Sequence, residues 1–430
     1  MSGAPAAAVA GMAAEMAREL TGNILPFWLE RAADPAGGFV GLVDAAGVAH
    51  PDAPRGAVLT ARILWTFSAA SRALGTPAYR AAADRAAAYL RAHLVDPAHG
   101  GVYWMVDGAG RPLDTRKHVY AQAFAVYGLA EHHRATGDAE SLRLAVALYA
   151  LVERHARDHR HGGYEEAFGR AWDLLDDVRL SEVDAPARKS TNTHLHVLEA
   201  YTGLYRAWPD PGLGARLAAV VELFLAHVVD AGRGRQRLFF DRDWTPRGGT
   251  VSFGHDVEAS WLLLEAADAL GDPALRARVA PAALRLAGAV RGVAFDAEHG
   301  GVYYEAPADA IDADAVDYSQ IDTDKEWWPQ AEAVVGFLAA YEEGGDPAFL
   351  RAAEATWAFV RRHVADAAGG EWFRRTARDG TPRPGHEKVG PWKCCYHNAR
   401  ACLEVMARAG AGRAPASPPR CRGTTSSCSA

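Results

Sequence analysis

The 430-residue chain lacks an unbroken apolar run of membrane-spanning length, which would need about 20 apolar residues. It also lacks a strong charge of either sign, because 46 Lys and Arg face 53 Asp and Glu. A modest net charge of -7 makes nucleic acid a poor candidate for the main partner. The Ala-rich start has no basic segment of the kind that opens a secretory signal. We therefore expect a cytoplasmic protein with no nucleic-acid or membrane partner.

Cysteine is scarce and confined to the last tenth of the chain. The five cysteines are Cys394, Cys395, Cys402, Cys421 and Cys428. An odd number gathered in one segment does not fit a disulfide framework. Because neighbouring helical residues point about 100° apart, Cys394 and Cys395 are a poor pair of zinc ligands, and we interpret them as small buried apolar side chains. Residues 411–430 have the composition of a disordered tail, so we expect residues 1–410 to form one domain.

The usual nucleotide and metal motifs are absent as well. The chain contains no strand-associated GxGxxG, no GxxxxGK[ST], no HExxH and no EF-hand loop. We therefore expect activity without a cofactor and without a metal ion.

One pattern recurs six times along the chain. Its clearest copies are "DPAHGGVYWMVDGAG" from Asp96 and "DAEHGGVYYEAP" from Asp296, and the six starts are 62 to 72 residues apart. Each unit contains a Gly-rich turn, an apolar helical run and a second, Ala/Arg-rich amphipathic run. Twelve helices in six units predict an all-α fold, an (α/α)6 barrel of six inner and six outer helices with short β-hairpins or loops at one end. An open helical solenoid is the alternative.

Side chains suited to chemistry gather where the helices after the Gly-rich turns begin. In a barrel these starts converge at one end of the ring, which predicts a pocket there. The residues are Arg62, Tyr120, Asn192, His196, His255, Glu258, Trp328, Glu332, Trp392 and His397.

Spacing indicates which of these side chains share a helix face. Asn192 and His196 are four residues apart and lie on one face, whereas His194 points elsewhere. The His-Leu-His sequence is therefore a poor metal site. His255 and Glu258 are three apart, so we expect the carboxylate to orient the imidazole.

Histidines and tryptophans around one pocket suit carbohydrate chemistry. Histidine can take and return a proton near neutral pH, and aromatic faces bind the apolar faces of sugar rings. A sugar epimerase or isomerase using histidines fits, and so does a glycosidase using paired carboxylates. A non-catalytic sugar-binding protein, or a helical toroid with zinc on Cys394, Cys395 and His397, is a further alternative.

Four segments occur in an order that matches a known family: "NTHLHVLEAYTGLYRAW", "GHDVEASWLLLEAA", "KEWWPQAEAVVGF" and "KCCYHNARACLE". Between about Arg62 and Glu404 the chain resembles the cellobiose 2-epimerases of the N-acylglucosamine 2-epimerase superfamily. The resemblance implies an (α/α)6 barrel and cofactor-independent epimerisation at C2 of the reducing-end sugar of β-1,4-linked disaccharides, through ring opening and a cis-enediolate. A mannose isomerase or N-acylglucosamine 2-epimerase on the same scaffold is the alternative. We expect a small disaccharide as substrate and a monomer or weak homodimer.

The resemblance also implies roles for individual residues. His255 and His397 would form the acid/base pair, and Arg62 and His196 would bind the oxygens of the reacting sugar. The remaining substrate-binding candidates are Asn192, Glu258, Glu332, Trp328, Trp392, Tyr120 and Asp184. Cys395 stands where the family pattern has proline, and Ala399 stands where glycine is usual. These two departures bear on disaccharide preference more than on the reaction.

Overall fold

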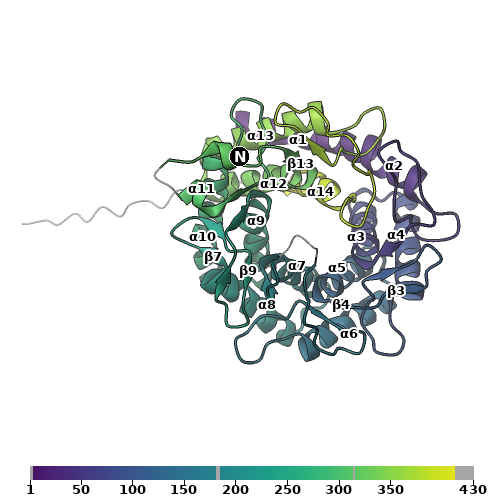
Figure 1. The fold of residues 1–430 in the computed structure, drawn as a ribbon. Helices are drawn as coiled ribbons and strands as arrows, with labels where there is room; N and C mark the ends of the chain where they lie inside the picture. The colour runs from purple at the N-terminus through teal and green to yellow at the C-terminus, as the bar shows by residue number, and fades with distance from the viewer. Residues whose placement is uncertain (1–2, 181–184, 313–314, 412–430) are drawn as a thin grey trace, which may run out of the picture.

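The helices form two concentric rings (Figure 1). The computed structural model describes residues 3–180, 185–312 and 315–411. The inner ring consists of α3 (Ala57–Leu74), α5 (Val119–Thr136), α7 (Thr191–Ala207), α9 (Phe253–Leu270), α12 (Trp327–Gly344) and α14 (Tyr396–Ala411). The first and last of these, α3 and α14, pack against each other and close the ring. The predicted (α/α)6 barrel is confirmed, and the open solenoid is wrong.

The outer ring wraps around these inner helices. Its members are α1 (Ala4–Glu19), α4 (Pro77–Tyr89), α6 (Ala139–His155), α8 (Pro211–Leu223), α10 (Pro273–Val293) and α13 (Pro347–Phe359). Wider π-helical turns extend several of them, namely η1 (Leu20–Ile24), η2 (Trp28–Ala32) on either side of α2 (Leu25–Phe27), η3 (Leu90–Leu94), η4 (Phe224–Val228) and η6 (Val360–Val364). Four outer helices begin with proline at the first position, where no amide hydrogen is needed.

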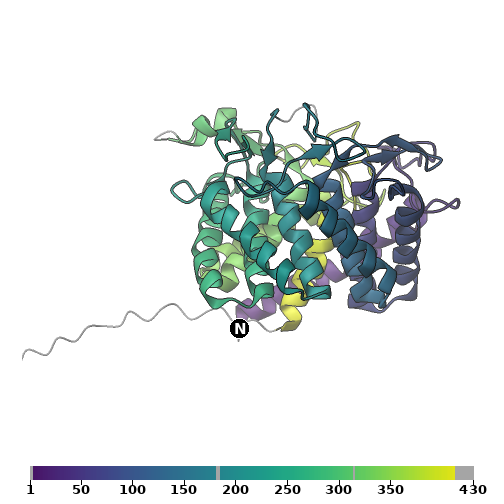
Figure 2. The ribbon, with the colours of Figure 1, turned by 90° about the horizontal axis from the view of Figure 1, so that it is seen from below.

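Short strands and loops cover one end of the rings (Figure 2). The strands are β1 (Arg55–Gly56), β2 (Met105–Val106), β3 (Pro112–Asp114), β4 (Lys117–His118), β5 (Ala167–Phe168), β6 (Lys189–Ser190), β7 (Val229–Asp230), β8 (Arg235–Gln236), β9 (Phe239–Phe240), β10 (Pro246–Arg247), β11 (Thr250–Ser252), β12 (Glu305–Pro307), β13 (Lys325–Glu326) and β14 (Arg375–Thr376). The short helices α11 (Ala308–Asp312) and η5 (Tyr318–Gln320) follow β12. All strand pairs are antiparallel, and most join the strand before an inner helix to the next repeat, as in β1–β2, β4–β5 and β13–β14.

A repeated ion pair fastens this end to the inner helices. In each repeat the first Asp accepts a hydrogen bond from the backbone of its own turn and pairs with a Lys or Arg further along. The pairs are Asp34–Arg55, Asp96–Lys117, Asp158–Lys189, Asp230–Arg237, Asp296–Lys325 and Asp366–Lys388. In four of the six repeats (Arg55, Lys117, Lys189 and Lys325) the basic residue lies two positions before the inner helix, so the pair holds the start of that helix against the turn.

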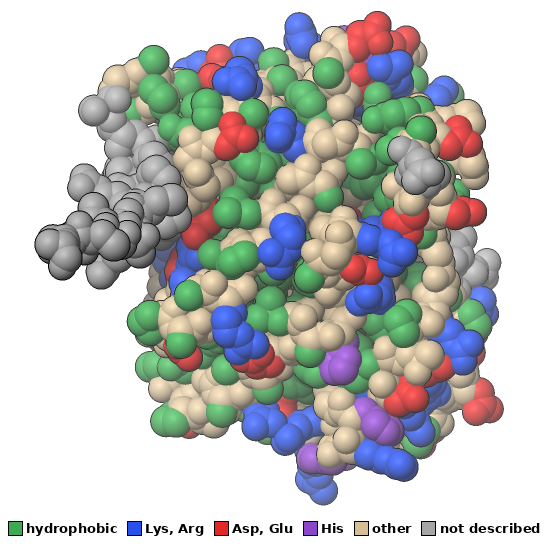
Figure 3. Space-filling view, turned by 90° about the vertical axis from the view of Figure 1, so that its left-hand side faces the viewer, with side chains coloured by type: hydrophobic (Ala, Val, Ile, Leu, Met, Phe, Trp, Pro, Cys, Tyr) green, Lys and Arg blue, Asp and Glu red, His purple; other side chains and the backbone are tan. Residues whose placement is uncertain are grey.

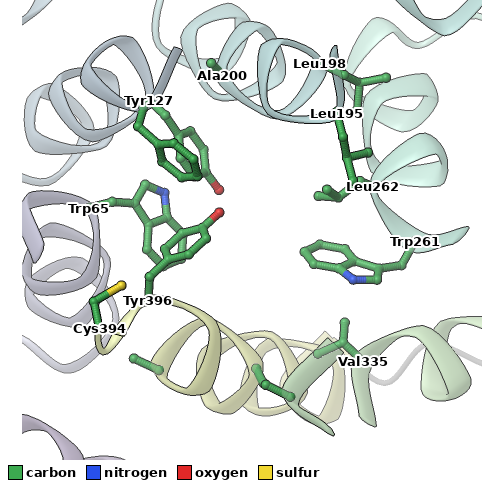
Figure 4. Packing of buried hydrophobic residues seen from close by; sticks show 14 of the residues in the cluster. Trp65, Tyr127, Leu195, Leu198, Ala200, Trp261, Leu262, Val335, Cys394 and Tyr396 are labelled. Atoms are coloured by element: carbon green, nitrogen blue, oxygen red, sulfur yellow. The ribbon is translucent and has the colours of Figure 1, made fainter. Parts of the chain in front are cut away.

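Aromatic side chains line the inside of the ring along the inner helices (Figure 4). Trp65 stacks on Tyr127 with ring centroids 5.3 Å apart, and Tyr396 meets Trp65 edge-on at 5.2 Å. Trp261 faces them from α9. Aromatic pairs at these distances stabilise the fold beyond the area that they bury. These aromatic side chains therefore lie below the pocket predicted at the helix starts.

The outer surface carries mixed charge. On the side where α10 lies, basic and acidic side chains are interspersed (Figure 3). One described stretch, Pro211–Val228, is long and apolar enough to cross a membrane by length and composition. It comprises α8 and η4, and its Leu213, Leu217 and Phe224 are fully buried in the barrel.

Candidate active site

The starts of the inner helices open into one cavity of about 430 Å³. All but two of the predicted site residues line it: Arg62, Tyr120, Asn192, His196, His255, Glu258, Trp328, Trp392 and His397. Glu332 lies behind this wall and binds His397. Asp184 lies outside the described residues.

The internal repeat explains why these side chains meet. Three inner-helix residues lie seven positions after a lysine, which is about two helical turns. They are His196 after Lys189, Glu332 after Lys325 and Arg400 after Lys393. The equivalent positions form a single layer across the axis, made of Arg62, Phe124, His196, Glu258, Glu332 and Arg400. Contacts between Arg62 and Phe124, and between Phe124 and His196, join neighbours in this layer.

Glu332 anchors His397 through one nitrogen of its ring. His397 Nδ1 lies 2.7 Å from Glu332 Oε1. Two other donors bind the same carboxylate: Arg400 Nη2 at 2.7 Å and Trp261 Nε1 at 3.0 Å. Because a cation and an indole N–H already donate to Glu332, the carboxylate accepts the Nδ1 proton of His397. The lone pair of His397 then resides on Nε2.

A second histidine is anchored in the same way. His196 Nδ1 lies 2.9 Å from Glu199 Oε2, and Glu199 Oε1 accepts from both Arg400 and Tyr396. Arg400 Nη2 also donates to Glu258 Oε1 at 2.5 Å. One buried guanidinium therefore joins three carboxylates and, through two of them, two histidines. Neither Arg400 nor Glu199 is among the residues predicted from sequence.

The third histidine has a different partner from the one predicted. His255 Nδ1 lies 2.7 Å from Ser252 Oγ. Glu258, expected to orient His255, instead binds Arg400, while its Oε2 has no hydrogen-bond partner among the described residues. The expectation was wrong because a side chain before the helix reaches the imidazole, and a cation from across the ring takes the carboxylate.

Burial sets the protonation of these groups. It lowers the pKa of His255 to about 4, with a further contribution from Arg62. Burial and the neighbouring cations hold the pKa values of His196 and His397 well below their usual range. Burial raises the pKa of Glu332, and the Glu258 carboxylate adds to that rise. With these lowered pKa values the three histidines are neutral near pH 7.

A permanent cation faces the histidines from α3. Arg62 is buried, and its Nη2 donates to the Tyr120 hydroxyl at 2.8 Å. Burial raises the pKa of Tyr120 to about 12, against the opposing influence of Arg62, so the phenol keeps its proton. Arg62 Nε has no partner among the described residues. Arg62 therefore brings a positive charge to the wall of the cavity.

Two tryptophans form the aromatic walls. The Trp328 ring lies 4.8 Å from His255 and 5.6 Å from His397, between centroids. This packing requires glycine at position 254, because a Cβ there would come within 2.4 Å of Trp328. Trp392 lies against Tyr120 at 5.8 Å and against Trp104, a residue not predicted from sequence, at 5.9 Å.

Further polar residues at the rim were also missed. Tyr304, Glu305, Glu326 and Arg374 line the cavity from strands and loops of the fifth and sixth repeats. Tyr304, Glu305 and Arg374 lie outside the helix starts, where the spacing argument does not apply, whereas Glu326 is the N-cap residue of α12.

A metal ion does not fit the carboxylates that could hold one. The ligand atoms of Glu258, Glu332 and His397 lie within 4.8 Å of one another. However, Arg400 Nη2 already binds both carboxylates, so a cationic partner is in place. Cys394 and Cys395 are fully buried, and burial raises the pKa of both thiols. They are packing residues, as predicted.

Comparison with known proteins gives a consistent result. The family model described as N-acylglucosamine 2-epimerase (GlcNAc 2-epimerase) matches residues 37–401. A cellobiose 2-epimerase of Bacteroides fragilis is 45% identical over 394 residues, covering 91% of this chain and 98% of its own. The solved cellobiose 2-epimerase of Bacillus thermoamylovorans B4167 superposes with a TM-score of 0.86 at 40% identity, covering 92% of this chain and 99% of its own. A D-mannose isomerase, at 23% identity and a TM-score of 0.79, shares the fold.

Proposed function

This chain belongs to the N-acylglucosamine 2-epimerase family, and we propose that it epimerises C2 of the reducing-end glucose or mannose in β-1,4-linked disaccharides. Cellobiose would give glucosyl-mannose, and lactose would give epilactose. The observation that carries this proposal is the pair His255 and His397, which line one cavity and are both held through Nδ1. Each can exchange a proton at Nε2 without a cofactor.

The reaction follows from the chemistry of the open-chain sugar. Once the ring opens, the C1 aldehyde acidifies the hydrogen on C2. One histidine, neutral, takes that proton on Nε2 and leaves a cis-enediolate. The other, already protonated on Nε2 by exchange with solvent, gives that proton to C2 from the opposite face. Arg62 and His196 would bind the enediolate oxygens, where preorganised donors stabilise the developing charge. Glu332 would stabilise the imidazolium form of His397.

The lining of the cavity also offers side chains for a second sugar ring. Trp392 and Asn192 line the cavity away from the His255–Trp328 contact, on the side of α5 and α7. Trp392 would stack on the second sugar, and the unpartnered Oδ1 of Asn192 would accept from a hydroxyl. Asp184 remains a prediction as a substrate-binding residue.

The glycosidase alternative fits the carboxylates poorly. Glycosidases place two carboxyl groups on either side of the scissile bond, about 5–10 Å apart. Here Glu258 and Glu332 both bind Arg400 Nη2, and Glu332 does not line the cavity. Neither carboxylate is placed to act across a glycosidic bond.

The test is incubation with cellobiose in heavy water. We expect glucosyl-mannose carrying deuterium at C2, with no release of free glucose. Product without deuterium would refute proton transfer, and free glucose would indicate a glycosidase. Free mannose in parallel separates the monosaccharide alternatives, because a mannose isomerase would convert it to fructose faster than it converts cellobiose.

We further propose that the enzyme works in the cytoplasm as a monomer or weak homodimer. Fractionation of the native cells and light scattering of the purified chain would test the two statements.

A further inference from the structure

Ser190 and Ser252 occupy equivalent positions in their repeats but make different hydrogen bonds. Ser190 and Ser252 each immediately precede an inner helix, at the N-cap position. Ser190 Oγ accepts from the backbone N–H of Thr193 at 3.1 Å, which is ordinary capping. Ser252 makes no such bond, and its Oγ lies 2.7 Å from His255 Nδ1. The side chain that would cap α9 is used on a histidine of the site.

The position of Ser252 is fixed by its surroundings. It is buried, and its strand β11 pairs with β12 so that Ser252 lies opposite Glu305. His255 is held from its other side by the Trp328 ring at 4.8 Å. Among the described residues, His255 is the one hydrogen-bond partner of Ser252 Oγ. The contact between Ser252 and His255 is therefore fixed by the packing around both side chains.

This contact bears on which ring nitrogen can act. A neutral histidine exchanges a C2 proton at Nε2 only when its own proton is on Nδ1. A hydroxyl accepting from Nδ1 favours that tautomer, and Ser252 lines the cavity, where its own O–H can point. Without an acceptor at Nδ1, the proton can move to Nε2, and the lone pair then faces away from the sugar.

Resting on the proposed function, we propose that Ser252 is the positioning residue of His255, holding its proton on Nδ1 so that Nε2 serves as the base for one of the two C2 epimers. Glu332 does the same for His397, the base for the other epimer. The two bases thus have unlike supports, a neutral hydroxyl for His255 and a carboxylate for His397. Removing either support impairs proton removal from one epimer more than from the other.

The test uses C2-deuterated cellobiose and C2-deuterated glucosyl-mannose, each incubated with full-length enzyme in ordinary water. The initial rate of deuterium loss from each epimer reports the base that serves it. We expect Ser252→Ala to slow loss from one epimer by about 10²-fold, with little change for the other and little change in KM. Ser252→Thr, which keeps the hydroxyl, should restore the rate. Glu332→Gln should show the opposite epimer preference.

Stability and tautomer measurements complete the test. Ser252→Ala should leave the midpoint of thermal unfolding nearly unchanged, whereas Ser190→Ala, which removes a cap, should lower it. Nitrogen-15 spectra of histidine-labelled enzyme, assigned with His255→Asn, should show His255 moving toward the Nε2–H form in Ser252→Ala. Equal slowing of both epimers with a lowered midpoint would overturn the inference in favour of a structural role, as would wild-type rates. Failure of the wild-type enzyme to release deuterium from either epimer would instead refute the proposed function.

Discussion

Arg400 is the residue whose removal should cost this fold most. Its guanidinium binds Glu199, Glu258 and Glu332, all fully or almost fully buried. Removing one partner of a buried ion pair destabilises a protein by about 3–5 kcal/mol, because the remaining charge is left uncompensated. Three carboxylates depend on this one cation. We therefore expect Arg400→Met to lower the free energy of unfolding at pH 8 by about 5 kcal/mol or more.

The loss should depend on pH in a direction that the carboxylates dictate. Burial already raises the pKa values of Glu258 and Glu332 above their unfolded values, and removing the cation raises them further. The folded variant therefore binds more protons than the unfolded chain above about pH 4.5, so its stability falls as pH rises. The deficit relative to the wild type should be small near pH 5 and largest at pH 8.

Urea unfolding at several pH values measures this deficit directly. Arg400→Lys is the matched control. The lysine ammonium keeps the charge but cannot bind Glu199 on one side and Glu258 and Glu332 on the other, as the planar guanidinium does. It should lose less than Arg400→Met. Adding Glu258→Gln and Glu332→Gln to Arg400→Met should recover part of the loss, because of the three carboxylates just Glu199 would then remain charged without the cation. A deficit below about 1 kcal/mol, the value of an exposed pair, or one independent of pH, would refute this account of the cluster.

Three further outcomes are expected. His397→Asn should abolish epimerisation of cellobiose with little effect on stability, and retained turnover in a product assay would remove His397 from the acid/base role. Trp392→Ala should raise KM for cellobiose roughly fivefold, from about 1 kcal/mol of lost aromatic contact, and leave KM for free mannose nearly unchanged; equal effects on both would contradict a second-sugar platform. Lys325→Met should lower the free energy of unfolding by about 3 kcal/mol. This is the low end for a buried ion pair, because Arg378 still binds Asp296. A loss under about 1 kcal/mol would show that the repeated ion pair does not support the fold.

The parts of the site that sequence predicts are those determined within one helix. Asn192 and His196 share a face because they are four residues apart, and the cavity contains both. His194 points away, to Ser190 O and Tyr164 N, as its spacing predicts. Six repeats of similar length also favour a closed ring over an open solenoid, because closure gives the first and last inner helices a neighbour on both sides.

The parts that sequence misses depend on contacts across the ring. Glu258 lies one turn from His255, so helical spacing alone favours a pair between them. Arg400, on α14, instead binds the Glu258 carboxylate, because a cation is a stronger partner for it than a neutral imidazole. Spacing along one chain segment carries no information about that approach. The repeat does carry some, because Arg400 follows Lys393 by the same seven residues that separate Lys325 from Glu332. Aligning the units on Arg55, Lys117, Lys189, Lys325 and Lys393, and not on the Gly-rich turn, would have placed Arg400 in the layer that contains Arg62 and His196.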